Sequence, residues 1–270
     1  MAYEPQNEEW LEYVVISERQ TAIVELARRE GRALVERLVA HFGVSPQTIR
    51  KDLNDICAAG TLKRTHGGAV FPSGVENMQY EARRQIASEE KDSIGRAAAA
   101  LIPKNASLFI NIGTTTEAVS QALVDHADLM IITNNINVAN RMRVYPKFEV
   151  AIAGGIVRAS DGGVVGEAAV DFIQQFKVDF AVIGASAIDE DGALLDFDYR
   201  EVKVAQAIIA NARHVILVSD STKFERTAPV RIAHLSQVDS FITDRCTLPS
   251  IRKICADSDV KLIETSLITR

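Results

Sequence analysis

The sequence contains few cysteines, and their spacing suits neither disulfides nor a metal site. Cys57, Cys246 and Cys255 are the only three, and no two of them form a C-x-x-C pair. An odd number without ligand spacing argues against a disulfide scaffold and a cysteine-ligated zinc site. We therefore expect free, buried or half-buried thiols, a reducing cytoplasmic location, and neither a metal nor a cofactor.

Long apolar runs are also missing. No stretch reaches the roughly 18 apolar residues of a transmembrane helix, and the first residues, MAYEPQNEEW, lack the basic and apolar segments of a secretory signal. We therefore expect no membrane partner. The composition that remains is typical of a globular chain, with 47% hydrophobic and 24% charged residues over 270 positions. This length predicts two domains with ample core.

The third shortage is positive charge. The chain carries 30 Lys and Arg against 36 Asp and Glu, a formal net charge of −6, which by itself argues against a nucleic-acid partner. The charge is unevenly spread, however, because residues 1–18 carry −5, residues 19–71 carry +4 and residues 72–270 carry −5. The acidic total therefore hides one basic segment that could contact DNA phosphates.

That basic segment has the pattern of a small helical domain. Apolar side chains recur at helical spacing over residues 20–29, 34–42 and 46–59, and glycine follows each stretch closely. Residues 61–71 then alternate loosely around Gly67-Gly68, which is typical of a hairpin. This succession predicts a winged helix-turn-helix over residues 19–72.

The third predicted helix is the candidate recognition helix. Ser45-Pro46 supplies an N-cap and a first-turn proline, and Ile49, Leu53 and Ile56 occupy the inner face. The other face and the hairpin carry side chains that could reach bases and phosphates of double-stranded DNA. The candidate contacts are Ser45, Gln47, Thr48, Arg50, Lys51, Asn54, Lys63, Arg64 and His66. A solvated face of an ordinary helical domain would show a similar pattern.

The rest of the chain predicts an α/β domain with a mostly parallel sheet flanked by helices. Short apolar runs alternate there with helical stretches, as in sheets covered by helices. The expected strands are 107–112, 129–133, 148–153, 179–184, 214–219, 240–243 and 260–263, and the expected helices include 117–124, 167–176 and 199–211. The predicted organisation is an extension (1–18), the winged domain (19–72), a helical linker (73–104) and a sensor domain (105–270).

Loops after these strands carry chemistry that suits a phosphate. Gly113-Thr114-Thr115-Thr116 leads from a strand into a helix, so backbone N–H groups and hydroxyls would face an anion. The loop matches neither a P-loop nor a dinucleotide fingerprint. Other loops at strand ends, where open α/β sheets bind ligands, add Asn134, Gly154, Gly155, Arg158, Asp189 and Lys223. As a set they fit a small phosphorylated polyol or sugar, although each alone fits turn chemistry.

Both parts of the chain resemble one known family. VSPQTIRKDLNDICAAGTLKRTHGGAVF resembles the signature of the DeoR family of bacterial repressors, and NIGTTTEAV, TNNINVAN, AGGIVRASDGGVVGEA, LLDFDYREV and RHVILVSDSTKF resemble its sensor domain. That sensor is similar in fold to ribose-phosphate isomerases and CoA transferases. The resemblance implies effector contacts at Thr114, Thr115, Asn134, Gly155, Arg158, Asp198, Glu201 and Lys223.

Three positions depart from the family pattern. Relatives usually have two arginines where Arg50 and Lys51 stand, and because Lys cannot make the bidentate contact of Arg, Arg50 is the better base reader. The second helix usually opens with Ser or Thr, but Leu34 stands there, so a side-chain cap should be missing. Relatives commonly have Asp in place of Asn111. The loss of this carboxylate is expected to change which hydroxyl of the effector is recognised.

The combined expectation is a homo-oligomeric repressor of a carbon-catabolic operon. A dimer or tetramer would present paired recognition helices to repeated operator half-sites, and a phosphorylated effector would release the DNA. Two alternatives stay open. One is a paralogous repressor that senses another sugar phosphate, for example from opine or pentose catabolism. The other is an isomerase-like enzyme with Asp189, Glu201 and Lys223 in acid–base roles.

Overall fold

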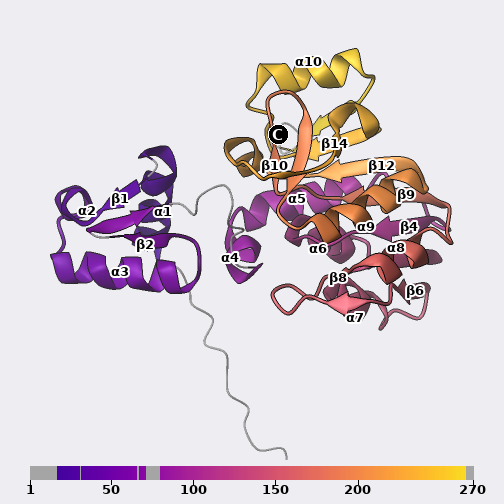
Figure 1. The fold of residues 1–270 in the computed structure, drawn as a ribbon, viewed down its shortest axis with the longest axis horizontal. Helices are drawn as coiled ribbons and strands as arrows, with labels where there is room; N and C mark the ends of the chain where they lie inside the picture. The colour runs from indigo at the N-terminus through magenta and orange to yellow at the C-terminus, as the bar shows by residue number, and fades with distance from the viewer. Residues whose placement is uncertain (1–16, 31, 66, 71–79, 266–270) are drawn as a thin grey trace, which may run out of the picture. The chain divides into compact units, whose positions relative to one another are not determined.

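The computed structural model describes residues 17–30, 32–65, 67–70 and 80–265. The chain divides into two compact units, residues 1–72 and residues 73–270 (Figure 1). Each unit packs its own apolar core. The segment predicted as an N-terminal extension, residues 1–18, lies outside the described residues apart from Ser17 and Glu18.

The first unit is the predicted winged helix-turn-helix. Its helices are α1 (Glu18–Glu30), α2 (Val35–Phe42) and α3 (Pro46–Ala58). Its strands are β1 (Arg32–Leu34), β2 (Lys63–Thr65) and β3 (Gly68–Val70), in the antiparallel order β1-β3-β2. Buried Ile23, Leu38, Ile49, Leu53 and Ile56 join the helices in one core, so the helical periodicity found in the sequence corresponds to real packing.

Strand β1 was missed by the sequence prediction. Leu34, which was expected to open the second helix, ends β1 and serves as the extended N-cap residue of α2, without a side-chain cap. The N–H of Val35 donates instead to the carbonyl of Gly67, at 2.9 Å. A Cβ on Gly68 would collide with the carbonyl of Ala33, so glycine at this position allows β3 to pair with β1.

The second unit is built on a parallel seven-stranded sheet with the order β15-β14-β12-β9-β4-β5-β6. The strands are β4 (Ser107–Ile110), β5 (Leu129–Thr133), β6 (Phe148–Ile152), β9 (Val178–Ile183), β12 (Ala212–Val218), β14 (Ser240–Thr243) and β15 (Lys261–Glu264). All seven were predicted, with ends that differ by at most two residues. Continuous apolar runs are the signature of strands buried on both faces, which explains this agreement.

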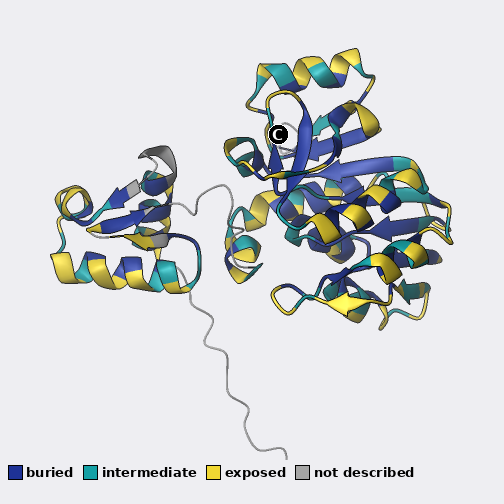
Figure 2. Ribbon diagram, viewed as in Figure 1, coloured by how far each residue is buried: buried dark blue, intermediate teal, exposed yellow. Residues whose placement is uncertain are grey.

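Helices cover both faces of the sheet. They are α4 (Tyr80–Gln85), α5 (Ser88–Ala99), α6 (Thr114–Ala122), α7 (Ile136–Met142), α8 (Glu167–Ile173), α9 (Tyr199–Ala210) and α10 (Pro249–Asp257). Leu108 and Ile110 pack with α5, α6 and α7 on one face, whereas Phe109 packs with α8, α9 and α10 on the other. Figure 2 shows the strands as a buried layer between more exposed helices.

Shorter elements decorate the sheet. The strand pair β7 (Ile156–Val157) and β8 (Val164–Val165) is antiparallel, as is the small sheet of β10 (Ala187–Ile188), β11 (Ala193–Asp196) and β13 (Val230–His234). Two 3-10 turns, η1 (Ser221–Glu225) and η2 (Leu235–Gln237), complete the unit. The sequence did not predict these strands, nor α7 and α10, because they are short and lack a clear period.

The segment predicted as a helical linker, residues 73–104, contains α4 and α5 in its described part and packs into the second unit. Ile94, Ala98 and Ala99 of α5 are buried in the core cluster that contains α6 and β4. Lys91 of the same helix is also buried. The described part of this segment is therefore integral to the α/β unit rather than a spacer.

The order of the strands reverses beside β4. From β4 the chain moves outward through β5 to β6, and it then returns to β9 on the opposite side of β4 and continues to β12, β14 and β15. The loops after β4 and β9 therefore lead away from each other. Open α/β sheets bind ligands at the carboxyl ends of their strands beside such a reversal.

The cysteines are free thiols, as predicted, with Cys57 half-buried and Cys246 and Cys255 buried. Burial raises the pKa of Cys255 to about 11. Among the described residues, no helix is long and apolar enough to cross a membrane. The same residues include no group of three or more His, Cys, Asp and Glu side chains placed to hold a metal ion.

The contact between α5 and α6 gives a test of the packing. A Cβ on Gly95 would lie 2.7 Å from the backbone of Ala118, so we expect Gly95→Ala to lower the free energy of unfolding by about 1–3 kcal/mol through overpacking, although alanine favours helices. Urea unfolding measures the change. Gly154→Ala is the control, because a Cβ there meets no atom within 4 Å. Equal stability of both variants would contradict the close contact.

Candidate functional site

The exposed face of α3 carries the predicted DNA contacts. Gln47, Arg50, Lys51 and Asn54 are exposed and Thr48 is half-buried, while the apolar stripe of the same helix is buried. Arg50 and Lys51 form no ion pair within the described part of the chain, so both are available to an anionic partner. Exposed amide and basic side chains on one helical face are the groups that read a major groove.

Local contacts set where α3 begins and how it is held. The Ser45 hydroxyl caps the helix by accepting from the N–H of Thr48 at 3.1 Å. Arg19 of α1 binds Asp52 through Nε at 2.6 Å and Nη2 at 3.2 Å, and Gln20 donates to Asp55 at 3.3 Å. Sequence reasoning missed Asp52. Its position three residues after Ile49, beside the apolar stripe, was the available signal.

The hairpin is tied to the recognition helix. Arg64 donates through Nε to the Asn54 side-chain oxygen at 3.1 Å and through Nη1 to the carbonyl of Gly68. Arg64 and Asn54, both predicted DNA contacts, are therefore hydrogen-bonded to each other. Lys63 lies in β2, but its side chain is not described, and His66 lies outside the described residues.

The Gly-Thr-Thr loop forms the start of α6, beside the strand-order reversal. Gly113 is the N-cap residue with φ 149°, and no side chain caps the helix. Thr114 is half-buried and Thr115 buried, and neither hydroxyl makes a hydrogen bond within the described residues. Thr116 differs, because its hydroxyl donates to the carbonyls of Asn111 and Gly113, at 2.7 and 2.8 Å. Thr116 therefore shapes the loop, whereas Thr114 and Thr115 keep free donors.

Neighbouring strand ends bring further polar groups to this edge. A Cβ on Gly184, after β9, would lie 3.7 Å from Thr116 and 3.8 Å from the carbonyl of Val218, so the ends of β4, β9 and β12 converge. Buried polar atoms without a partner in the described structure include the Asn134 Oδ1, the Ser219 hydroxyl and the Asp220 Oδ2. Buried polar atoms normally have partners, so these three atoms keep unused hydrogen-bonding capacity.

Lys223 contributes a buried amine near the same strand end. It lies in η1, directly after β12. Burial lowers the pKa of Lys223 to about 7, against the raising effect of Asp220. Burial likewise raises the pKa of Asp220, but Lys223 and Lys91 outweigh it and hold that pKa below its usual range.

Arg158 is surrounded by carboxylates. It binds Asp161 through Nε at 2.9 Å and Nη2 at 2.7 Å, Asp198 at 3.2 Å and Glu201 at 2.5 Å. The guanidinium therefore orients these acids and is already paired. Arg200 is the main group that lowers the pKa of Asp198 to about 2, whereas burial and then Asp196 raise the pKa of Glu201.

The predicted glycines Gly154 and Gly155 differ in their surroundings. A Cβ on Gly155, whose φ is +146°, would lie 3.0 Å from the carbonyl of Val165. Gly155 thus permits the close approach of the two short strands β7 and β8. Gly154 is exposed and has open space around its Cα.

A buried polar network adjoins the loop and was missed by sequence reasoning. Glu117 accepts from the hydroxyl of Tyr80 at 2.6 Å, from Asn135 at 3.0 Å and from Asn137 at 3.1 Å. The amide of Asn137 also donates to the Tyr80 oxygen at 2.9 Å. The network links α4, α6 and α7, and no sequence signal connects Tyr80 with residues so far along the chain.

Within the described residues, no hydrogen bond or ion pair joins Asp189, Glu201 and Lys223, the acid–base set of the isomerase alternative. Asp189 lies in the turn between β10 and β11, where its N–H donates to the carbonyl of Ala193 at 3.0 Å. Glu201 is ion-paired with Arg158 instead.

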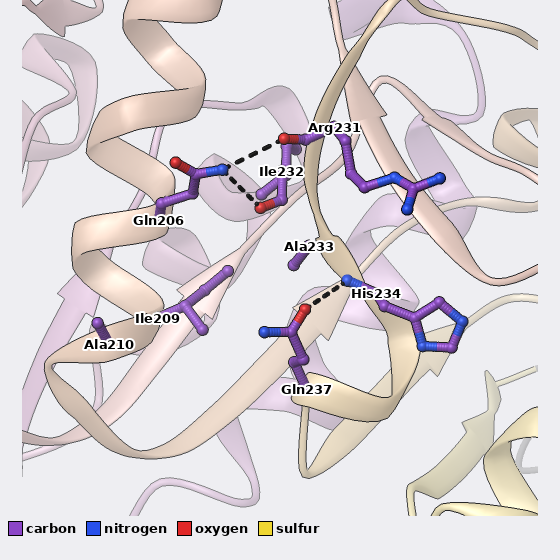
Figure 3. Close-up of a pocket in the computed structure, with 8 residues that line it drawn as sticks. All are labelled: Gln206, Ile209, Ala210, Arg231, Ile232, Ala233, His234 and Gln237. Carbon is purple, nitrogen blue, oxygen red and sulfur yellow. Dashed lines mark hydrogen bonds between the residues drawn. The ribbon is translucent and has the colours of Figure 1, made fainter.

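A separate groove lies between α9 and β13 (Figure 3). Gln206 spans it by donating to the carbonyls of Arg231 and Ile232, at 3.3 and 3.1 Å. His234 accepts from the N–H of Ser236 and thereby caps η2. These side chains hydrogen-bond to the backbone, so the groove lacks the unpartnered polar groups found at the strand ends beside α6.

Comparisons with known proteins follow this division of the chain. Residues 19–75 match the DeoR-like helix-turn-helix domain and residues 86–245 match the DeoR C terminal sensor domain. The glycerol-3-phosphate regulon repressor of Escherichia coli (strain K12) is 46% identical over 91% of this chain and 98% of its own. The Haemophilus influenzae protein of that name is 49% identical over 83% and 88%. The E. coli HTH-type transcriptional repressor CsqR is 36% identical over 91% and 94%.

Solved structures show weaker similarity. Ribose 5-phosphate isomerase A from Neisseria gonorrhoeae is 11% identical, with a TM-score of 0.38 over 50% of this chain and 53% of that chain. A translation initiation factor eIF-2B from Pyrococcus horikoshii OT3 is 13% identical, with a TM-score of 0.44 over 83% and 94%.

A winged helix-turn-helix with an exposed basic face, followed by an α/β unit, defines the class as a DNA-binding transcriptional regulator. The matched domains and the named relatives then give the family. The chain belongs to the DeoR family and is a transcriptional repressor, not an enzyme.

The pKa of Lys223 gives a pH-dependent test of this edge. In the folded protein the pKa is about 7, against 10.5 for an ordinary lysine, so between these values the unfolded chain holds more protons and the free energy of unfolding rises with pH. We expect Lys223→Met to reduce this rise between pH 7 and 9 by roughly 2 kcal/mol. Urea unfolding at each pH measures it, with the exposed Lys104→Met as control. Parallel curves for the wild type and Lys223→Met would contradict the buried amine.

Proposed function

We propose that this chain represses a carbon-catabolic operon and that a small phosphorylated polyol releases it from its operator. Glycerol 3-phosphate is the first candidate, because the relatives at 46% and 49% identity are named glycerol-3-phosphate regulon repressors. The observation that carries the proposal is the set of unpartnered hydroxyls and buried polar atoms around the start of α6, at the reversal of strand order.

The charges around the start of α6 suit a ligand with one anionic end and one hydroxyl-rich end. The uncapped N–H groups of α6, the hydroxyls of Thr114 and Thr115 and the amine of Lys223 are donors for a phosphate. Asp198 and Glu201 beside Arg158 are acceptors for hydroxyl hydrogens, and Asn134 offers an unpartnered oxygen. A phosphorylated polyol combines both kinds of group in one small molecule.

DNA binding is assigned to the exposed face of α3 and to the hairpin. Residues 19–71 have a net positive charge, whereas the segments on either side are net acidic, and phosphate contacts supply much of the affinity of DNA-binding domains. A charge of +4 over residues 19–71 is modest. Specific binding is therefore proposed to need more than one chain on the operator.

A homo-oligomer, dimer or tetramer, follows from that need. Strand β6 is an edge of the parallel sheet, and Ile152 of β6 with Ile156 and Val157 of β7 is exposed. Exposed apolar side chains near a sheet edge are suited to association. Light scattering of the full chain measures its mass in solution, and a monomer at operator-binding concentrations would contradict this part of the proposal.

The second candidate is a repressor that senses another sugar phosphate, for example from opine or pentose catabolism. The relative at 36% identity matches most of the chain under a different name, so similarity across the family alone leaves the effector open. A thermal-shift screen of phosphorylated sugars separates the candidates, because a ligand that binds only the folded state raises its apparent stability. Stabilisation by another sugar phosphate but not by glycerol 3-phosphate would favour the second candidate.

Arg50 tests the recognition helix. Replacing it by alanine removes a bidentate donor from the exposed face, so we expect operator binding to weaken by about 1–3 kcal/mol. A gel-shift titration at fixed salt measures the loss, and Arg143→Ala on the second unit is the control. Unchanged affinity of Arg50→Ala would remove Arg50 from the set of base readers.

Thr114 tests the effector site. Thr114→Ala deletes a hydroxyl without touching the first unit, so we expect normal operator binding. Release should need at least about ten-fold more glycerol 3-phosphate, since a hydrogen bond to a charged group contributes about 1.5–3 kcal/mol. Gel shifts with increasing ligand measure release, and Thr247→Ala, an exposed threonine, is the control. Release of Thr114→Ala at the wild-type concentration would exclude the hydroxyl as a ligand contact.

A further inference from the structure

Helix α4 contacts the proposed effector site although sequence reasoning assigned it no role. It is a short helix beside α5 and α6 (Figure 1). The hydroxyl of Tyr80 bonds Glu117 of α6, and Arg83 approaches Asp161 at 3.3 Å. Lys91 of α5 donates to the carbonyls of Arg83 and Ile86 and so holds the carboxyl end of α4.

Arg83 is incompletely paired in this arrangement. Both oxygens of Asp161 already accept from Arg158, at 2.9 and 2.7 Å, so Arg83 has only the longer contact to Oδ2. The Nε of Arg83 is buried and has no hydrogen-bond partner in the described structure. A guanidinium carries five N–H donors, and a buried donor without an acceptor is unfavourable. The side chain is therefore short of an anion.

The charges around Arg83 favour an anion with more than one negative charge. Arg83 adds to the lowering of the pKa of both Lys91 and Lys223, so the three cations lie close enough to repel one another. Asp220 is the carboxylate that raises the pKa of both lysines, and Asp161 is shared with Arg158. A bound anion would therefore reduce the repulsion within the cation cluster of Arg83, Lys91 and Lys223.

We propose that Arg83 binds the phosphate of the effector and that α4 thereby becomes part of the ligand-bound state. The ligand class is a phosphomonoester dianion, whose oxygens accept from a guanidinium fork in one plane. This inference rests on the proposed function, because it adds a ligand group to the same site. It differs from that proposal in placing the contact on α4 rather than on a strand-end loop.

Arg83 lies in the helix that follows the winged unit in the sequence, so phosphate binding by Arg83 could influence DNA binding. Residues 71–79 alone join α4 to β3 of the winged unit in the sequence. A ligand that binds one arrangement of α4 better than another shifts the protein toward that arrangement. Occupancy of the site would then act on the segment that leads directly to the DNA-binding unit.

The test compares two neighbouring arginines of α4. Arg83→Met removes the proposed ligand group, and Arg84→Met is the matched control, because Arg84 is largely exposed and pairs with Glu81. Calorimetric titration of each full-length protein with glycerol 3-phosphate should show at least a ten-fold weaker Kd for Arg83→Met and less than a two-fold change for Arg84→Met. Arg83→Lys, which keeps the charge but loses the fork, should fall between Arg83→Met and the wild type.

Hydrogen–deuterium exchange gives a readout that a merely structural role would not move. Glycerol 3-phosphate should protect the amides of residues 80–85 in the wild type and in Arg84→Met, but not in Arg83→Met. Wild-type affinity in both Arg83 variants, or protection confined to the start of α6, overturns the role of Arg83 and leaves the proposed function intact. If the wild type binds neither glycerol 3-phosphate nor any sugar phosphate in the screen, both proposals are wrong.

Discussion

The reversal of strand order between β4 and β9 is the constraint that determines where the second unit can bind a ligand. Helices cover both faces of the sheet, so its faces are closed, and the polar ends of its strands are the remaining open positions. At the reversal the connecting loops diverge, and the start of α6 keeps N–H groups that no side chain caps. Thr114, Thr115 and Lys223 lie at this shared edge of the sheet, which is why their donors could act on one ligand.

The charged side chains around this edge differ in how fully they are paired. Arg158 forms ion pairs with Asp161, Asp198 and Glu201. These pairs orient the three acids and occupy the guanidinium, so Arg158 is not free to bind a ligand. The shortage of acceptors then falls on Arg83, whose partner Asp161 is already occupied. A single shared carboxylate thus separates an acid-rich region from a cation-rich one, and a molecule with a phosphate and hydroxyls complements both.

The sequence was most informative where one stretch of chain determines the structure. The recognition helix follows from Ser45-Pro46 and the stripe of Ile49, Leu53 and Ile56, and the buried strands follow from their apolar runs. It failed where a contact joins distant residues, as for Arg19 with Asp52 or Tyr80 with Glu117, since neither side chain has a local pattern. Strand β1 was missed for another reason: it has three residues, and so short a stretch shows no periodicity that would distinguish a strand from the start of a helix.

The same distinction explains why the effector is harder to infer than the DNA-binding role. A recognition helix exposes its chemistry on one face of a continuous segment, and α3 does so with Gln47, Arg50, Lys51 and Asn54. The proposed ligand site draws on the ends of several strands and on α4, so its specificity would lie in how these parts meet. A change in any one of these parts would alter the preferred ligand while the fold and the DNA-binding unit stay the same, because binding specificity belongs to a site that the fold carries.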